Sequence, residues 1–242
     1  MRAVVATRSR WIWWLAAIVI FIAVCLYPVS NRFTRACGAW LFCVLWIGLV
    51  AAVWKWRIGR FTMLGITATI VIFLLLPGRT QRDAAALRNG YVEGLLRYEG
   101  VRYFWGGECA TGIDCSGLIR RGLVDSLCLR GVRTLDPGLV RHALWLWWHD
   151  CTARALGEGH GMTSLLLETP SINVLDHAKI LPGDIAVTAN GLHIMAYLGG
   201  NRWIEADPGP MSVIVVSVPE EKNPWFGQPM KVMRWDILGQ KP

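Results

Sequence analysis

The sequence predicts an α+β fold preceded by three transmembrane helices. The first 77 residues contain three long apolar spans and no Asp or Glu. Beyond them, apolar residues recur every three or four positions through residues 84–98 and 115–127, as in amphipathic helices. Short apolar runs separated by tight turns occupy residues 181–206, as in antiparallel strands. Helices followed by such strands are typical of α+β domains, in which the helices pack on the antiparallel sheet.

Residues 1–77 are expected to form a membrane anchor, with spans at about 11–27, 36–54 and 61–76 that contain no charged residue. At about 1.5 Å per residue, the second span is long enough to cross a hydrocarbon core, whereas the first and third need flanking residues or local bilayer thinning. A cleaved signal peptide is the alternative. Such a peptide has one apolar region and a small-residue cleavage site, and here two more apolar spans follow.

The net charge of +8 lies entirely in the anchor. Eight of the 25 basic residues fall in the first 77 positions, which leaves 17 basic side chains to balance the 17 acidic ones in the rest of the chain. A domain without net charge offers no electrostatic footprint for a polyanion, so nucleic acid is not an expected partner. The lipid bilayer and, through the three helices, a membrane protein are the partners expected of the anchor.

Basic residues flanking the spans also indicate an orientation. They are slightly more frequent on the side of the amino terminus, which favours a cytoplasmic amino terminus. An odd number of spans then places residues 78–242 on the periplasmic, or extracytoplasmic, side of the cytoplasmic (inner) membrane.

A cysteine occupies the start of a predicted helix. After the loop Tyr103–Gly107, Asp114 is placed at an N-cap and Cys115 in the first helical turn. The free N–H groups and the positive end of the helix dipole favour a thiolate there, and the thiolate is the reactive form of cysteine. Taken alone, however, a single Cys near a helix start is more often an inert buried residue.

A predicted strand meander further along the chain supplies a histidine. Short strands at 185–187, 192–199 and 203–206 are joined by tight turns. His193 and Glu205 fall on neighbouring strands, so a hydrogen bond between their side chains is within reach.

These residues resemble the NlpC/P60 family of cysteine peptidases. Tyr103–Gly117 is similar to the family's nucleophile motif, and Pro182-Gly183-Asp184, His193-Ile194 and Tyr197-Leu198-Gly199 are similar to its histidine strand. The resemblance covers about residues 84–237, with Cys before His as in the family. It implies a papain-like catalytic domain at 78–242 that needs no cofactor and hydrolyses peptidoglycan stem peptides, commonly between D-Glu and a diamino acid.

The resemblance also implies roles for individual residues. The nucleophile, the general base and the group that orients the base are expected to be Cys115, His193 and Glu205. The residues expected near the oxyanion and the substrate are Tyr103, Asp114 and Ser116. The orienting position is often His in the family, and a carboxylate there can still hold the imidazole in one tautomer and favour a thiolate–imidazolium pair.

A long segment at about 130–180 separates the two motifs and carries Trp145, Trp147 and Trp148. It is interpreted as an insertion whose helix packs into the core, closes over the cleft as a lid, or lies on the bilayer. The sequence does not choose among these.

The other histidines and cysteines are weaker indications of a functional site. His142 and His149 have no carboxylate in register, so no metal site is expected. The three cysteines of the soluble part can supply one disulfide in an oxidising compartment, with the pair left open; they are Cys109, Cys128 and Cys151.

Two other functions compete with a peptidase. One is a papain-like acyltransferase or thioesterase acting on lipids, but the relatives with that activity have the Cys and His motifs in the reverse order. The other is a catalytically silent module that binds cell wall or acts as a scaffold. A binding role does not require Cys115, His193 and Tyr103 together, so their presence favours an enzyme.

Overall fold

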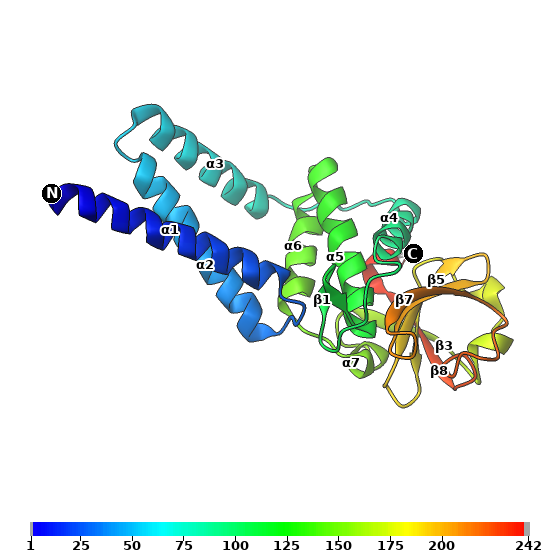
Figure 1. Ribbon diagram of the computed structural model, residues 1–242. Coiled ribbons are helices and arrows are strands. Elements are labelled where there is room, and N and C mark those ends of the chain that lie inside the picture. The colour runs from blue at the N-terminus through cyan, green and yellow to red at the C-terminus, as the bar shows by residue number, and fades with distance from the viewer. Residues whose placement is uncertain (1, 240–242) are drawn as a thin grey trace.

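The computed structural model describes residues 2–239 (Figure 1). Its helices are α1 (Arg2–Leu26), α2 (Arg32–Val53), α3 (Arg57–Leu75), α4 (Ala84–Leu96), α5 (Cys115–Arg133), α6 (Pro137–Trp148) and α7 (Ala153–Gly157). Its strands are β1 (Glu108–Cys109), β2 (Gly112–Ile113), β3 (Thr163–Thr169), β4 (Ile185–Thr188), β5 (Ile194–Gly199), β6 (Arg202–Asp207), β7 (Ser212–Ser217) and β8 (Met230–Trp235).

A six-stranded antiparallel sheet forms the framework of the part after α3, in the order β3-β8-β4-β5-β6-β7. One face packs on the pair α4 and α5, through residues such as Ile185 and Ile204. The other face is covered by the segments around Ile172 and Phe226. Because both faces are buried, β4 and β5 consist almost entirely of apolar residues instead of alternating with polar ones.

The predicted helices and antiparallel strands are present, and β4, β5 and β6 form the expected meander. Ile185 pairs with Ala196, which in turn pairs with Ile204. His193 differs slightly from the prediction, because β5 begins one residue after it. Its N–H donates to the hydroxyl of Thr188 at 2.9 Å instead of to a ladder carbonyl, which delays the start of the strand.

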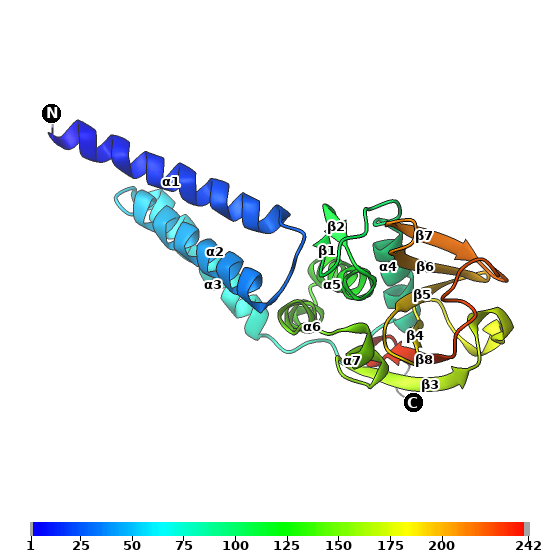
Figure 2. The same cartoon turned by 60° about the horizontal axis from the view of Figure 1, so that its bottom comes forward.

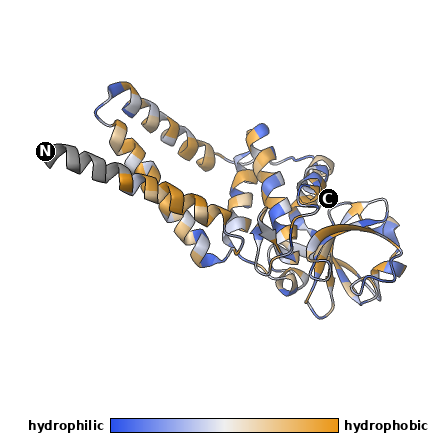
Figure 3. Ribbon diagram, in the orientation of Figure 1, coloured by the Kyte–Doolittle hydropathy of each residue, from blue (hydrophilic) through white to orange (hydrophobic). Residues whose placement is uncertain are grey.

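Two of the three predicted spans, in α2 and α3, are long and apolar enough to cross a membrane, and their apolar stretches are not buried in the protein. The described apolar part of α1, Ile12–Leu26, is shorter than a span requires. Figure 3 shows the apolar colouring of these helices. The three helices project together from the rest of the molecule, with the start of α1 and the α2–α3 turn at the distal end (Figure 1).

The segment at 130–180 is built into the domain framework. The helix α6 packs along α5, where Trp145 and Trp147 are half-buried against the core and Trp148 is 44% exposed. The strand β3 pairs with β8 and forms one edge of the sheet. The three cysteines that were expected to supply one disulfide form none: Cys109, Cys128 and Cys151 are all free thiols.

A buried ion-pair network joins α2 to the part of the chain that follows the three apolar helices. Arg35, in the first turns of α2, is 3% exposed and lies 2.5 Å from Glu108. Arg120 of α5 lies 3.2 Å from the other oxygen of Glu108, and both arginines approach Asp150. Three of these four side chains are almost fully buried, so removing one charge leaves its partners without compensation.

The variant Arg35→Met is therefore expected to destabilise the full-length protein by about 3–5 kcal/mol. For a domain of this size, that corresponds to a melting temperature lower by about 6 °C or more in detergent. Arg32→Met is the matched control, because Arg32 is exposed at the start of the same helix. Equal melting temperatures for the two variants would contradict a stabilising role for the network.

Candidate active site

Asp114 fixes the start of the helix that carries Cys115. It is the N-cap of α5, and its Oδ1 accepts from the N–H of Gly117 at 2.6 Å. Its Oδ2 accepts from the N–H of Gly106 at 2.8 Å, which ties the preceding loop to the helix. Ser116 donates its hydroxyl to Oδ1 at 3.0 Å. Asp114 and Ser116 thus lie beside Cys115, and the carboxylate of Asp114 makes three internal hydrogen bonds.

The loop and the helix approach each other too closely for larger residues. The N–H of Asp114 donates to the carbonyl of Gly107 at 3.0 Å. A Cβ on Gly117 would overlap that same carbonyl oxygen, and a Cβ on Gly107 would overlap the carbonyl of Gly112. The two glycines at these contacts therefore let the backbone of the loop lie directly against the first turn of α5.

The thiol of Cys115 is buried, with 8% of the residue exposed. Burial, and then the nearby Asp114 carboxylate, raise the pKa of the thiol to about 12, and the N–H groups of Ser116, Ile194 and Cys115 itself oppose this only in part. Desolvation therefore opposes the thiolate that the helix terminus was expected to favour. The contact with the N–H of Ile194 places the sulfur beside the peptide of the preceding residue, His193.

His193 is held by a buried carboxylate. Its Nε2 lies 2.6 Å from Oε2 of Glu205, and the two side chains are 2% and 0% exposed. An ionised Glu205 accepts only, so Nε2 carries the proton and Nδ1 is left as the acceptor of the neutral ring. The contact anticipated between these two residues is present.

Glu205 and His193 are each supported by a residue that the sequence analysis did not identify. Asn223 donates its side-chain amide to Oε1 of Glu205 at 2.5 Å. The ring of Trp225 stacks on that of His193, with the centroids 4.2 Å apart and the planes inclined by 16°. Both belong to the loop between β7 and β8, in which no periodicity or motif marks a functional residue. Only the folded chain brings this loop to the histidine.

Tyr103 lies close to the same group of side chains. It is 6% exposed, and its N–H donates to the carbonyl of Met211 at 2.9 Å. Burial raises the pKa of its hydroxyl, and the negative forms of Cys115, Asp114 and Asp207 add to the effect. Tyr103 therefore stays a neutral hydroxyl that can donate a hydrogen bond near the sulfur.

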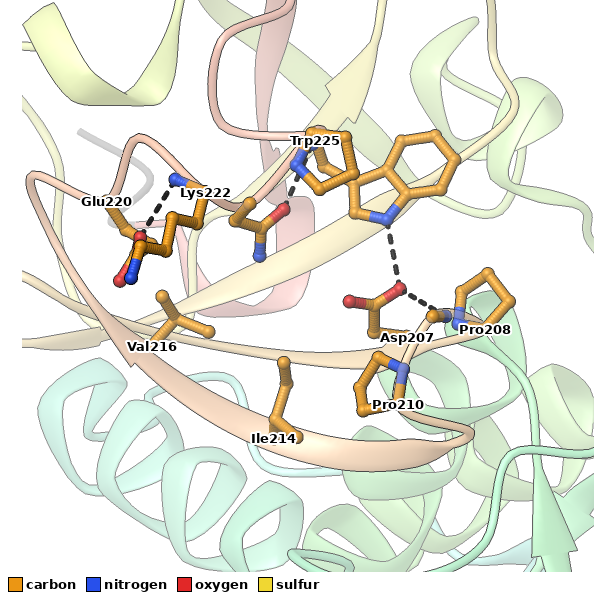
Figure 4. Close-up of a pocket in the computed structure, with 11 residues that line it drawn as sticks. Asp207, Pro208, Pro210, Ile214, Val216, Glu220, Lys222 and Trp225 are labelled. Carbon is orange, nitrogen blue, oxygen red and sulfur yellow. Dashed lines mark hydrogen bonds between the residues drawn. The ribbon is translucent and has the colours of Figure 1, made fainter.

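A pocket of about 510 Å³ is lined in part by Trp225 (Figure 4). The same indole stacks on the ring of His193. The indole N–H of Trp225 donates to Oδ1 of Asp207 at 3.1 Å, and the N–H of Gly209 donates to the same oxygen at 2.9 Å. The rest of the lining combines prolines, Ile214 and Val216 with the polar residues Glu220, Lys222 and Asn223. A pocket with both apolar and charged walls can accept part of a substrate near the histidine.

No protein-family model and no curated protein matches the chain. Several solved structures of NlpC/P60 proteins are similar to it. They include NlpC1 from Trichomonas vaginalis, at 19% identity over 65% of this chain and 46% of that chain with a TM-score of 0.40. The peptidoglycan hydrolase RipB from Mycobacterium tuberculosis matches at 18% identity over 76% of this chain and 88% of RipB, with a TM-score of 0.42. The NlpC/p60 domain of the peptidoglycan hydrolase SagA matches at 22% identity over 62% of this chain and 98% of that domain, with a TM-score of 0.34.

The chain spans about half the length of NlpC1 and of NlpC2, both from Trichomonas vaginalis. All of these similarities have low identities and low TM-scores. The chemistry assigned to this chain therefore depends on the geometry of its own residues.

Proposed function

We propose that the protein is a membrane-anchored cysteine endopeptidase of the NlpC/P60 type that hydrolyses amide bonds in peptidoglycan stem peptides. The observations that carry the proposal concern Cys115, His193 and Glu205. The Cys115 thiol, at a helix start, is bonded by the backbone N–H of Ile194, the residue after His193, and Nε2 of His193 is bonded to the buried carboxylate of Glu205. Burying an ionisable pair is costly, and a nucleophilic catalyst requires this arrangement of nucleophile, base and orienting group.

The reaction proposed for this group begins with a neutral thiol. Nδ1 of His193 accepts the thiol proton as the sulfur attacks the carbonyl carbon, and Glu205 stabilises the imidazolium that forms. The N–H groups at the start of α5 and the hydroxyl of Tyr103 stabilise the oxyanion. The imidazolium then protonates the leaving amine, and an acyl-thioester remains on Cys115. Water, activated by the same imidazole, releases the acid and restores the thiol.

The anchor is proposed to be residues 1–77, with all three helices crossing the membrane and residues 78–242 outside the cytoplasm. The apolar stretches of α2 and α3 are not buried in the protein, unlike the core helices of a soluble domain. The whole of α1 has 25 residues, about 37 Å at the α-helical rise, and it packs along α2. Arg35 follows α1 and is bonded to the soluble part, which supports an anchor that is retained in the mature protein.

A pair of reporters fused after Pro242 tests this topology. We expect activity from a reporter that functions only outside the cytoplasm and none from one that functions only inside. The opposite pattern would contradict the extracytoplasmic location of the domain and, with it, the proposed access to peptidoglycan.

The activity is tested with the full-length protein in nanodiscs, incubated with defined muropeptides whose products are identified by mass. We expect a single amide of the stem peptide to be cleaved by the wild-type protein and not by Cys115→Ala. Release of fatty acids from lipids without peptide cleavage would instead identify a lipid-acting enzyme. Binding of muropeptides without turnover by either protein would identify a silent binding module.

A further inference from the structure

The turn between α1 and α2 lies directly against the loop that precedes Cys115. Val29 forms an antiparallel bridge with Gly107. On either side of it, the N–H of Ser30 donates to the carbonyl of Gly106 at 2.9 Å, and the N–H of Glu108 donates to the carbonyl of Pro28 at 3.0 Å. The connection between α1 and α2 thus pairs with the loop of the active site through a single bridge; Figure 2 shows this connection near β1 and β2.

These bonds set the distance between the anchor and the nucleophile. The carbonyl of Gly107 accepts from the N–H of Asp114, the residue before Cys115. The backbones of Val29 and Asp114 are therefore separated by two hydrogen-bonded spacings of about 4.8 Å, or roughly 10 Å in all. Val29 follows closely on the end of α1 at Leu26, where the chain leaves the apolar part of the bundle.

A second attachment holds the other side of the domain. Arg141 of α6 donates to the carbonyls of Leu74 and Leu76, at 2.7 and 2.6 Å, where α3 ends. Arg82, in the connection from α3 to α4, pairs with Asp136 at 2.8 Å, just before α6 begins. A single attachment would let the domain rotate about its linker. Two attachments, both at the same end of the three helices (Figures 1 and 2), restrict its orientation relative to them.

Large exposed side chains occur at both attachments. Trp105 is 79% exposed and Phe104 37%, immediately before the residue that pairs with Ser30. On α6, Leu144 is 48% and Trp148 44% exposed. Aromatic residues gather where membrane proteins meet the headgroup region, so these side chains suit a surface that rests on the bilayer.

From this geometry we infer that the site acts at the bilayer surface, on peptides still attached to a membrane lipid. The inference rests on the proposed peptidase function and anchor. Cys115 follows Asp114, whose backbone lies roughly 10 Å from that of Val29 in the turn, so the nucleophile reaches bonds close to the surface where this turn leaves the bilayer. The two attachments leave no flexible linker that would let the domain reach peptides deep in an assembled wall.

A series of lipid-anchored substrates of increasing height tests the inference. The cleaved stem-peptide sequence is joined to a lipid through rigid polyproline spacers of zero, five and ten residues, which extend about 0, 15 and 30 Å. Full-length protein in vesicles is assayed on each, with the lipid-free peptide as reference. We expect kcat/KM to fall by a factor of at least ten from the shortest to the longest spacer.

A rate that stays level or rises with spacer length, together with cleavage of the lipid-free peptide, would overturn the inference and leave the peptidase function intact. Failure to cleave every substrate, the lipid-free peptide included, would instead overturn the proposed function.

The variant Arg141→Gln tests the second attachment without touching the active site. In this variant we expect the ratio of kcat/KM between the shortest and the longest spacer to be at least threefold smaller than in the wild type. Hydrolysis of the lipid-free peptide should stay within twofold of wild type. Arg133→Gln, at the exposed carboxyl end of α5, is the matched control and should keep the wild-type dependence. Identical spacer dependence in the Arg141 and Arg133 variants would contradict the role given to the second attachment.

Discussion

Replacing Cys115 by alanine is expected to lower kcat/KM for stem-peptide hydrolysis by a factor on the order of 10⁴ to 10⁶. The reason is that no other group can form the acyl intermediate. The loss should appear in single-turnover experiments, since it concerns the chemical step. Binding and folding should persist, because the alanine Cβ fits where the cysteine Cβ lies and the cap by Asp114 is unaffected.

Cys128→Ala is the control, since Cys128 is an exposed thiol on the same helix. It should retain wild-type turnover. His193→Ala should lose nearly as much activity as Cys115→Ala, and the double variant little more than either, because the two groups act as a unit. Losses that multiply in the double variant would show that the two residues act independently and would contradict the mechanism.

The substitution Glu205→Gln is expected to lower kcat by a factor of roughly 10² to 10⁴ and to move the acidic limb of the kcat/KM profile to lower pH. Burial raises the pKa of the Cys115 thiol to about 12, so the thiol is neutral over the working range. The acidic limb then reports protonation of the imidazole, which inactivates the base. Removing the carboxylate 2.6 Å from Nε2 makes the imidazolium less stable, so its formation requires more acid.

The direction of this pH shift separates two mechanisms. With a preformed thiolate–imidazolium pair, the acidic limb would belong to the thiol, and loss of the carboxylate would move it to higher pH. Glu205→Ala should lose more activity than Glu205→Gln, because nothing then orients the ring. Glu205→His restores a polar partner of the type common in the family and should therefore retain more activity than Glu205→Ala. Equal rates near wild type for all three variants would remove Glu205 from the site.

Much of the fold and the centre of the candidate site follow from local sequence signals. Asp114 before Cys115 specifies a capped helix because its carboxylate bonds to an N–H three residues away. The turns after β4 and β5 bring neighbouring strands together, and with them His193 and Glu205. Three apolar spans without acids predict an anchor, although only α2 and α3 are both long and apolar enough to cross a membrane within the described residues.

Interactions between distant parts of the chain were decided by the tertiary structure. The pKa of the Cys115 thiol is raised by burial in the folded core, an effect larger than those of the N–H groups that lower it. Asn223 and Trp225 reach Glu205 and His193 from a loop without periodicity. The attachment of Val29 to Gly107 joins residues far apart in sequence. Periodicity and capping report interactions over a few residues, whereas desolvation and long-range pairing exist only once the chain has folded.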